Sequence, residues 1–108
     1  MGYVYLLMQV DEEGLETYKI GVTKNNPELR VKQLQTGNPN KISVVNSYET
    51  PNYLKVEQWI HRKYFNSKTL ARNEWRNLTN DEVMSFLIDC EKANETISVL
   101  KKTNHFFN

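Results

Sequence analysis

Residues 3–23, YVYLLMQVDEEGLETYKIGVT, contain the strongest structural signal in the chain. Both ends of this stretch are rich in β-branched and aromatic residues, and residues 11–14 between them have the composition of a turn. The pattern predicts a β-hairpin with strands over residues 3–10 and 17–23. Because successive side chains of a strand point to opposite faces, each strand should present two chemically different faces.

One face of the predicted hairpin is apolar. It collects Val4, Leu6, Met8, Val10, Tyr18, Ile20 and Val22. The opposite face collects Tyr3, Tyr5, Thr17, Lys19 and Gly21. A one-residue slip would expose the apolar set, so this register is expected, with the Tyr5 phenol and the Lys19 amine side by side on neighbouring strands.

A short helix and a third strand should follow the hairpin. Asn26 and Pro27 are typical N-cap and first-turn residues, and Gly37 is typical of a helix end. They predict a helix of two to three turns. Residues 42–49 then have the composition of a strand.

Two further helices are expected in the second half of the chain. Thr50 and the proline after it predict a helix that reaches residue 64, and residues 74–78 read as a short extended piece or turn. Thr79 and Glu82 form a capping box that opens the last helix. Its apolar stripe consists of Val83, Phe86, Leu87, Cys90, Ile97 and Leu100. The order predicts one α+β domain over residues 1–108.

The composition favours a soluble, intracellular protein. The apolar run at the N-terminus lacks a basic flank and is too short to span a membrane. The single cysteine, Cys90, cannot form an internal disulfide, and with only two histidines it makes no convincing zinc site. We therefore expect no membrane association and a cytoplasmic location.

Positive charge is concentrated in one segment of a nearly neutral chain. Overall, 14 Lys and Arg face 13 Asp and Glu, which alone argues against a polyanionic partner. Residues 55–76, however, hold six basic and two acidic residues, for a net charge of +4, together with Trp59, Tyr64, Phe65 and Trp75. Basic residues interleaved with aromatics suit a phosphate backbone with stacked bases. The open alternative is a solvated helix face, with Trp59 and Trp75 serving mainly the core.

Several side chains suited to phosphate chemistry should lie near the hairpin. Arg30, on the first helix, offers a fork for phosphate oxygens, while Tyr5 or Lys19 could accept a proton from water if its pKa is lowered. Glu57, on the second helix, offers the hard oxygen that Mg²⁺ prefers, and His61 follows one turn later on the same surface. For each residue, an ordinary structural role is the open alternative.

An ordered series of motifs resembles the GIY-YIG nuclease superfamily. The series consists of Tyr3-Val4-Tyr5, residues 18–23 (YKIGVT), Arg30 with residues 33–39 (QLQTGNP), residues 56–65 (VEQWIHRKYF) and Glu74-Trp75. It covers residues 2–88 and leaves 89–108 as a C-terminal helix and tail. The second signature, KIG at residues 19–21, is similar to that of the phage and viral branch, so a phage or virus protein acting inside a host cell is expected.

The resemblance implies a small three-stranded antiparallel sheet flanked by helices, and hydrolysis of phosphodiester bonds in DNA with a single Mg²⁺ or Mn²⁺ ion. It places Tyr5 beside the attacking water, Lys19 at a position where tyrosine is commoner, and Arg30 on the scissile phosphate. Glu57 would bind the metal. His61 would contact phosphate or metal-bound water.

Substrate contacts are expected on and after the same helix. Arg62 and Lys63 belong to the basic segment, and the resemblance implies a polar side chain near the phosphate, for which Asn73 and Asn77 are candidates. The lysine at the second signature leaves a catalytically inactive nucleic-acid-binding module as an alternative, and a protein-interaction domain as a third. The oligomeric state is open, with a homodimer as one way to cut both strands.

Overall fold

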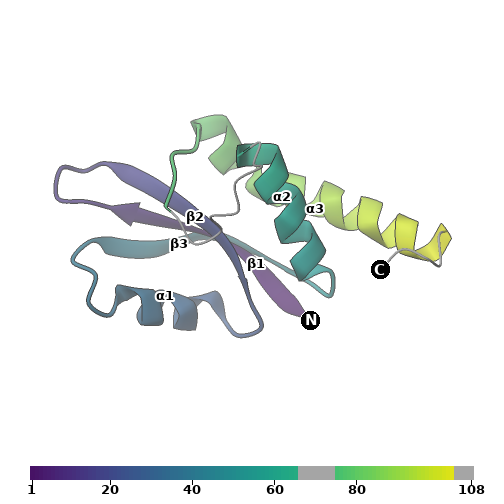
Figure 1. Cartoon of the computed structure of the whole chain (residues 1–108), viewed down its shortest axis with the longest axis horizontal. Helices are drawn as coiled ribbons and strands as arrows, with labels where there is room; N and C mark the ends of the chain where they lie inside the picture. The colour runs from purple at the N-terminus through teal and green to yellow at the C-terminus, as the bar shows by residue number, and fades with distance from the viewer. Residues whose placement is uncertain (66–74, 104–108) are drawn as a thin grey trace.

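Three antiparallel strands form the sheet on which the helices pack (Figure 1). In the computed structural model, which describes residues 1–65 and 75–103, β1 covers Gly2–Val10, β2 covers Glu16–Thr23 and β3 covers Lys41–Thr50. The strand order is β2-β1-β3, so β2 and β3 lie on either side of β1. The predicted α+β class, the hairpin and the three-stranded antiparallel sheet are confirmed.

The hairpin register matches apolar residues across the two strands. Val4 pairs with Val22, Leu6 with Ile20, and Met8 with Tyr18. The expectation for the other face needs one correction, because Tyr5 pairs with Gly21 and Lys19 pairs with Leu7. Tyr5 and Lys19 are therefore diagonal neighbours, for which the Cα atoms lie roughly 7–8 Å apart, within reach of long side chains.

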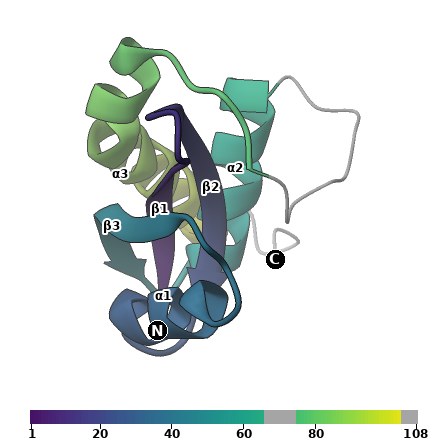
Figure 2. The same ribbon diagram turned by 90° about the vertical axis from the view of Figure 1, so that its left-hand side faces the viewer.

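Helix α1, Pro27–Gln35, covers the face of the sheet that carries Tyr5 and Leu7 (Figure 2). The helix begins as predicted, since the Asn26 side chain accepts a hydrogen bond from the Glu28 N–H at 3.0 Å. At its other end, Gln35 Oε1 accepts from the N–H of Ile42 at 2.9 Å, which ties the helix to β3.

Helices α2, Tyr53–Phe65, and α3, Asn80–Thr103, pack on the opposite face (Figures 1 and 2). The predicted start of α2 at Thr50 was wrong: Thr50 ends β3, and its hydroxyl accepts from the N–H of Asn52 at 3.0 Å. The predicted start of α3 is confirmed, because Thr79 N–H donates to Glu82 Oε1 at 2.9 Å and Glu82 N–H donates to Thr79 Oγ1 at 3.2 Å.

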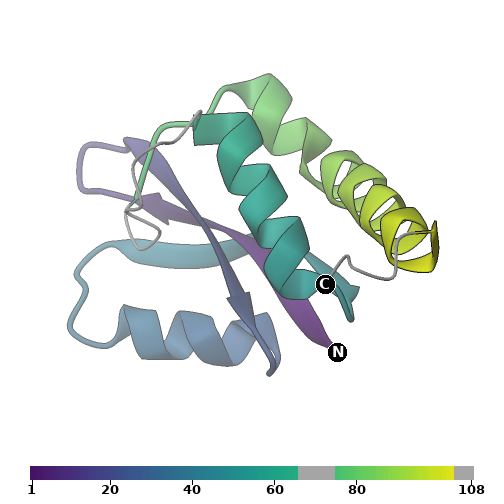
Figure 3. The ribbon, with the colours of Figure 1, turned by 45° about the vertical axis from the view of Figure 1, so that its right-hand side comes forward.

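The sheet separates two apolar clusters. The larger, under α2 and α3, contains Val4, Leu6, Tyr18, Ile20, Val56, Ile60, Phe86, Cys90, Ala93 and Ile97. The smaller, under α1, contains Tyr5, Leu7, Val31 and Ile42, with Trp75 packed against it. Three predicted core residues are instead exposed, namely Trp59, Leu87 and Leu100. Figure 3 shows that α3 runs beside α2 and extends beyond the sheet.

The edge of β2 is paired over a short distance by the segment that precedes α3. Tyr18 N–H donates to the Arg76 carbonyl at 2.7 Å, and Arg76 N–H donates to the Tyr18 carbonyl at 2.8 Å. This is the short extended piece that the sequence predicts around residue 76.

Within residues 1–65 and 75–103, no helix combines the length and the apolar character that a membrane span requires.

Candidate functional site

Tyr5 lies on the central strand and packs directly over Gly21 of β2. Its side chain is buried, with only 2% of the residue exposed. A Cβ atom at position 21 would lie 2.6 Å from Cζ of Tyr5, which real Cβ contacts essentially never show. Gly21 is therefore required so that the phenol can lie across β2.

Lys19 is an almost fully buried cation on the same side of the sheet. It is 5% exposed, and its Nζ atom lies 5.8 Å from the centroid of the Trp75 ring. Burial lowers the pKa of Lys19, and the positive charge of Arg30 lowers it further. The amine thus gives up its proton more readily than an exposed lysine does.

Arg30 projects from α1, which covers this face of the sheet. Its Nη1 atom donates to Gln33 Oε1 at 3.2 Å, one helical turn away. Because its charge acts on Lys19, the guanidinium lies close to the amine. Strand β2 and helix α1 therefore bring Lys19 and Arg30 together, as the sequence predicts.

Glu57 and His61 approach β2 from α2, on the other side of the strand. Glu57 is 4% exposed, and its Oε1 atom lies 3.6 Å from Nε2 of His61. The same His61 nitrogen lies 3.2 Å from the carbonyl oxygen of Ile20. The carboxylate and imidazole therefore lie beside the backbone of β2, at the residue between Lys19 and Gly21.

The expected substrate contacts are placed less centrally. Arg62 and Asn77 are exposed, and Asn73 lies outside the described residues. Lys63 forms an ion pair with Asp89 of α3, with 2.8 Å between Nζ and Oδ1. Lys63 is therefore engaged in holding α3 against α2.

Asp89 is the centre of a polar cluster that sequence reasoning missed. Besides Lys63, it accepts hydrogen bonds from Tyr64 Oη at 2.6 Å and from Ser85 Oγ at 3.0 Å. Burial alone would raise the pKa of Asp89, but these hydrogen bonds outweigh burial and lower it. The available signal was an aspartate inside the apolar stripe of the last helix, next to Cys90.

Trp75 is the second contribution that sequence reasoning missed. We expected it in the core, and it does pack against the smaller apolar cluster, but it also lies beneath Lys19. Its distance along the chain from the hairpin hides this contact. Only the backbone pairing of Arg76 with Tyr18 brings the tryptophan to β2.

The fold and these side chains define an α+β domain in which ionisable groups gather on both sides of one edge strand. A family model for the T5orf172 domain matches residues 2–91, so the chain belongs to the T5orf172 domain family, a member of the GIY-YIG nuclease clan. Comparisons with curated proteins and with solved structures give no match.

The clan typically uses a divalent metal, and the residues present can be tested against that requirement. Within the described part of the chain, no group of three or more His, Cys, Asp or Glu side chains could hold a metal ion. Mg²⁺ does not need such a group, because it usually keeps several waters and binds one or two carboxylates together with substrate phosphates. The Glu57 carboxylate therefore fits Mg²⁺ or Mn²⁺, with water and phosphate oxygens as the other ligands.

Proposed function

We propose that this protein is a metal-dependent endonuclease that hydrolyses phosphodiester bonds in DNA, and that it belongs to the phage and viral branch with a KIG second signature. The observation that carries the proposal is the burial of Lys19 and Glu57 on opposite sides of β2. Charged side chains are rarely this buried, and ionisable groups with a perturbed pKa, such as Lys19, concentrate at functional sites. Family membership supplies the class of chemistry.

Three side chains on the α1 side of the sheet would act on the phosphate and the water. The Arg30 guanidinium binds the non-bridging oxygens of the scissile phosphate. Lys19, whose pKa is lowered, accepts the proton of the attacking water. The Tyr5 hydroxyl, held across Gly21, orients that water.

Glu57 would hold the metal ion, and His61 would fix the carboxylate in place. When bound, the ion supplies positive charge that stabilises the leaving oxygen. The Nε2 atom of His61 lies 3.2 Å from the Ile20 carbonyl oxygen and 3.6 Å from the Glu57 carboxylate, so the imidazole lies between the carboxylate and the strand that carries Lys19. Such second contacts commonly orient metal ligands.

DNA is the proposed partner because Lys55, Arg62 and Lys63 of the basic segment lie on the helix that carries Glu57. Arg62 is exposed there, and Asn77 is exposed after it, while Asn73 belongs to the same predicted set. Contacts of this kind bind phosphates without reading bases, so cleavage should have low sequence specificity. Cutting both strands would require two copies of the site.

The direct test is cleavage of supercoiled plasmid by the purified protein with Mg²⁺, compared with EDTA and with Glu57→Ala. The matched control is Glu95→Ala, which removes an exposed glutamate of α3. We expect nicking by the wild type and the control, and a loss of at least about 100-fold in Glu57→Ala with DNA binding retained. Unchanged activity in Glu57→Ala would refute the metal role, and salt-dependent binding without any cleavage would favour a non-catalytic module.

A further inference from the structure

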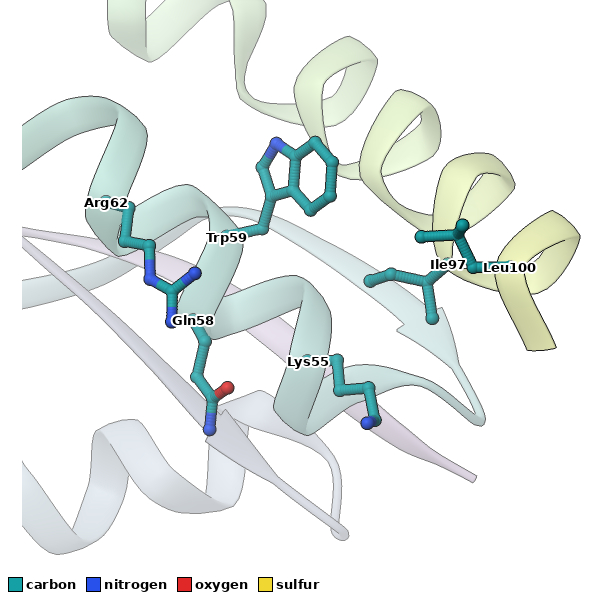
Figure 4. A pocket seen from close by; sticks show the side chains of 6 residues that line it. All are labelled: Lys55, Gln58, Trp59, Arg62, Ile97 and Leu100. Atoms are coloured by element: carbon teal, nitrogen blue, oxygen red, sulfur yellow. The ribbon is translucent and has the colours of Figure 1, made fainter. Parts of the chain in front are cut away.

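Trp59 lies on the surface of α2, although the sequence predicted it in the core. It is 41% exposed and faces a hollow between α2 and α3 (Figure 4). The described side chains that line this hollow are Lys55, Gln58, Trp59, Arg62, Ile97 and Leu100. Because the indole is exposed in this hollow, packing in the core does not explain the tryptophan at this position.

The lining combines an aromatic plane with cations and an apolar wall. Lys55 and Arg62 lie four residues before and three residues after Trp59, so all three share one face of α2. Figure 4 shows the indole between the two helices, opposite Ile97 and Leu100. An adjoining hollow is lined by Trp59, Arg62 and Lys63. The groove thus continues on both sides of the indole.

The groove has room for a single ring system. The hollow between α2 and α3 measures about 250 Å³, and the adjoining one, lined by Trp59, Arg62 and Lys63, about 360 Å³. Pockets for drug-sized ligands run from about 300 to 1,000 Å³. The first hollow lies below this range and the second at its lower end, so each has room for one planar ring system.

The electrostatics favour an anionic ligand. Among the described residues that line the two hollows, Lys55, Arg62 and Lys63 are cationic and none is acidic, although Lys63 is paired with Asp89.

We propose that this groove binds an unpaired nucleotide of the DNA substrate, with the base stacked on Trp59 and its phosphates on Arg62 and Lys55. Stacked bases within a duplex cannot present a face to an indole, whereas single-stranded bases can. The proposal rests on the proposed function for the identity of the polymer. It adds a substrate class: DNA with a single-stranded segment next to the cut site.

The position of the groove fits a strand that continues from the proposed site. Glu57 and Trp59 are two residues apart on α2, so they point to nearly opposite sides of the helix. A helix with its side chains is about 10–12 Å across. A few nucleotides of single strand cover that distance.

The test is binding of fluorescently labelled oligo(dT) and of a labelled duplex to the full chain in EDTA, followed by anisotropy. Alanine replacement of a stacking aromatic weakens binding by roughly 5- to 150-fold. We expect a loss in that range for oligo(dT) with Trp59→Ala, a much smaller loss with Trp59→Phe, and a change of less than about twofold for the duplex. Met84→Ala, at an exposed apolar residue elsewhere on α3, is the matched control.

The proposal is overturned if Trp59→Ala, folded by circular dichroism, binds oligo(dT) as the wild type does, or if the wild type does not bind oligo(dT). It is also overturned if Trp59→Ala and Met84→Ala weaken binding equally. Because the measurement is made without metal, it does not depend on catalysis. If the protein cleaves plasmid but Trp59→Ala binds oligo(dT) with unchanged affinity, the nuclease proposal stands and only the proposal of nucleotide binding in the groove is refuted.

Discussion

At the scale of single residues, the most informative side chain is Lys19. An exposed lysine is charged at neutral pH and cannot accept a proton, but burial and the nearby Arg30 charge lower the pKa of this one. The same amine could instead hold phosphate as a cation. A permanent positive charge at position 19 would preserve phosphate binding but would abolish proton acceptance, so a permanently charged side chain distinguishes the two roles.

The substitution Lys19→Arg separates these roles. A guanidinium stays protonated, so we expect single-turnover cleavage to fall by about 10²- to 10⁴-fold if the amine accepts the proton. The wild-type rate should rise with pH, because the neutral amine is the active form. Near-normal cleavage by Lys19→Arg would contradict the proton-acceptor role and assign Lys19 to phosphate binding.

A second prediction for a single residue concerns the contact between Gly21 and the Tyr5 ring. In Gly21→Ala, the new methyl group meets the Tyr5 ring and must displace it. Overpacking of this kind costs about 1–3 kcal/mol, so urea denaturation should show a loss of that size together with a loss of cleavage. Thr17→Ala, on the same strand, is the control. Wild-type stability and cleavage in Gly21→Ala would argue against a fixed position for Tyr5.

At the scale of elements, the start of α3 rests on local chemistry alone. Thr79 and Glu82 exchange hydrogen bonds at the first turn. Thr79→Ala should therefore reduce the free energy of unfolding by about 1 kcal/mol, measured with urea. Thr96→Ala, at an exposed position within the helix, should cost less. An equal cost for both would mean that the capping box adds no stability.

The contact between α2 and α3 depends on Asp89, and this makes it sensitive to acid. The pKa of Asp89 is lowered in the folded protein, so its stabilising contribution is complete above the ordinary pKa of about 3.9 and is lost as the pH falls through the folded-state value.

In Asp89→Asn the free energy of unfolding should therefore depend less on pH below about 4, and at pH 7 it should be lower by about 2 kcal/mol. Urea titrations at a series of pH values check both statements. A variant with the same acid dependence as the wild type would show that other carboxylates cause it.

The elements show which features were predictable from sequence. The hairpin, α1 and the capping box depend on residues close together in the chain, and each was predicted correctly. The start of α2 was misplaced because Thr50 can cap a helix or end a strand, and the sheet partner decides. The exposure of Leu87 and Leu100 was missed because their spacing fits a core stripe, and spacing along a helix does not show which positions other elements cover.

At the scale of the whole molecule, the candidate site joins segments that sequence reasoning could not position. Tyr5 and Lys19 were assigned to one face from strand alternation, and Arg30 from its helix. The contact of His61, the neighbour of Glu57 on α2, with the Ile20 carbonyl depends on tertiary packing, and the position of Trp75 beneath Lys19 depends on the backbone pairing at Arg76. The basic, partly aromatic segment was predicted from the distribution of charge along the chain, but the hollow that Trp59 faces, with Ile97 and Leu100 of α3 in its lining, depends on tertiary packing.

The central claim is that Tyr5, Lys19, Arg30 and Glu57 form one metal-dependent site around β2. The most direct measurement is the anomalous scattering of crystals soaked in Mn²⁺. The account predicts a peak coordinated by the Glu57 carboxylate on the α2 side of β2, with Tyr5, Lys19 and Arg30 on the α1 side of the same strand. An anomalous peak at another site, with no Mn²⁺ at the Glu57 carboxylate under saturating Mn²⁺, would contradict it.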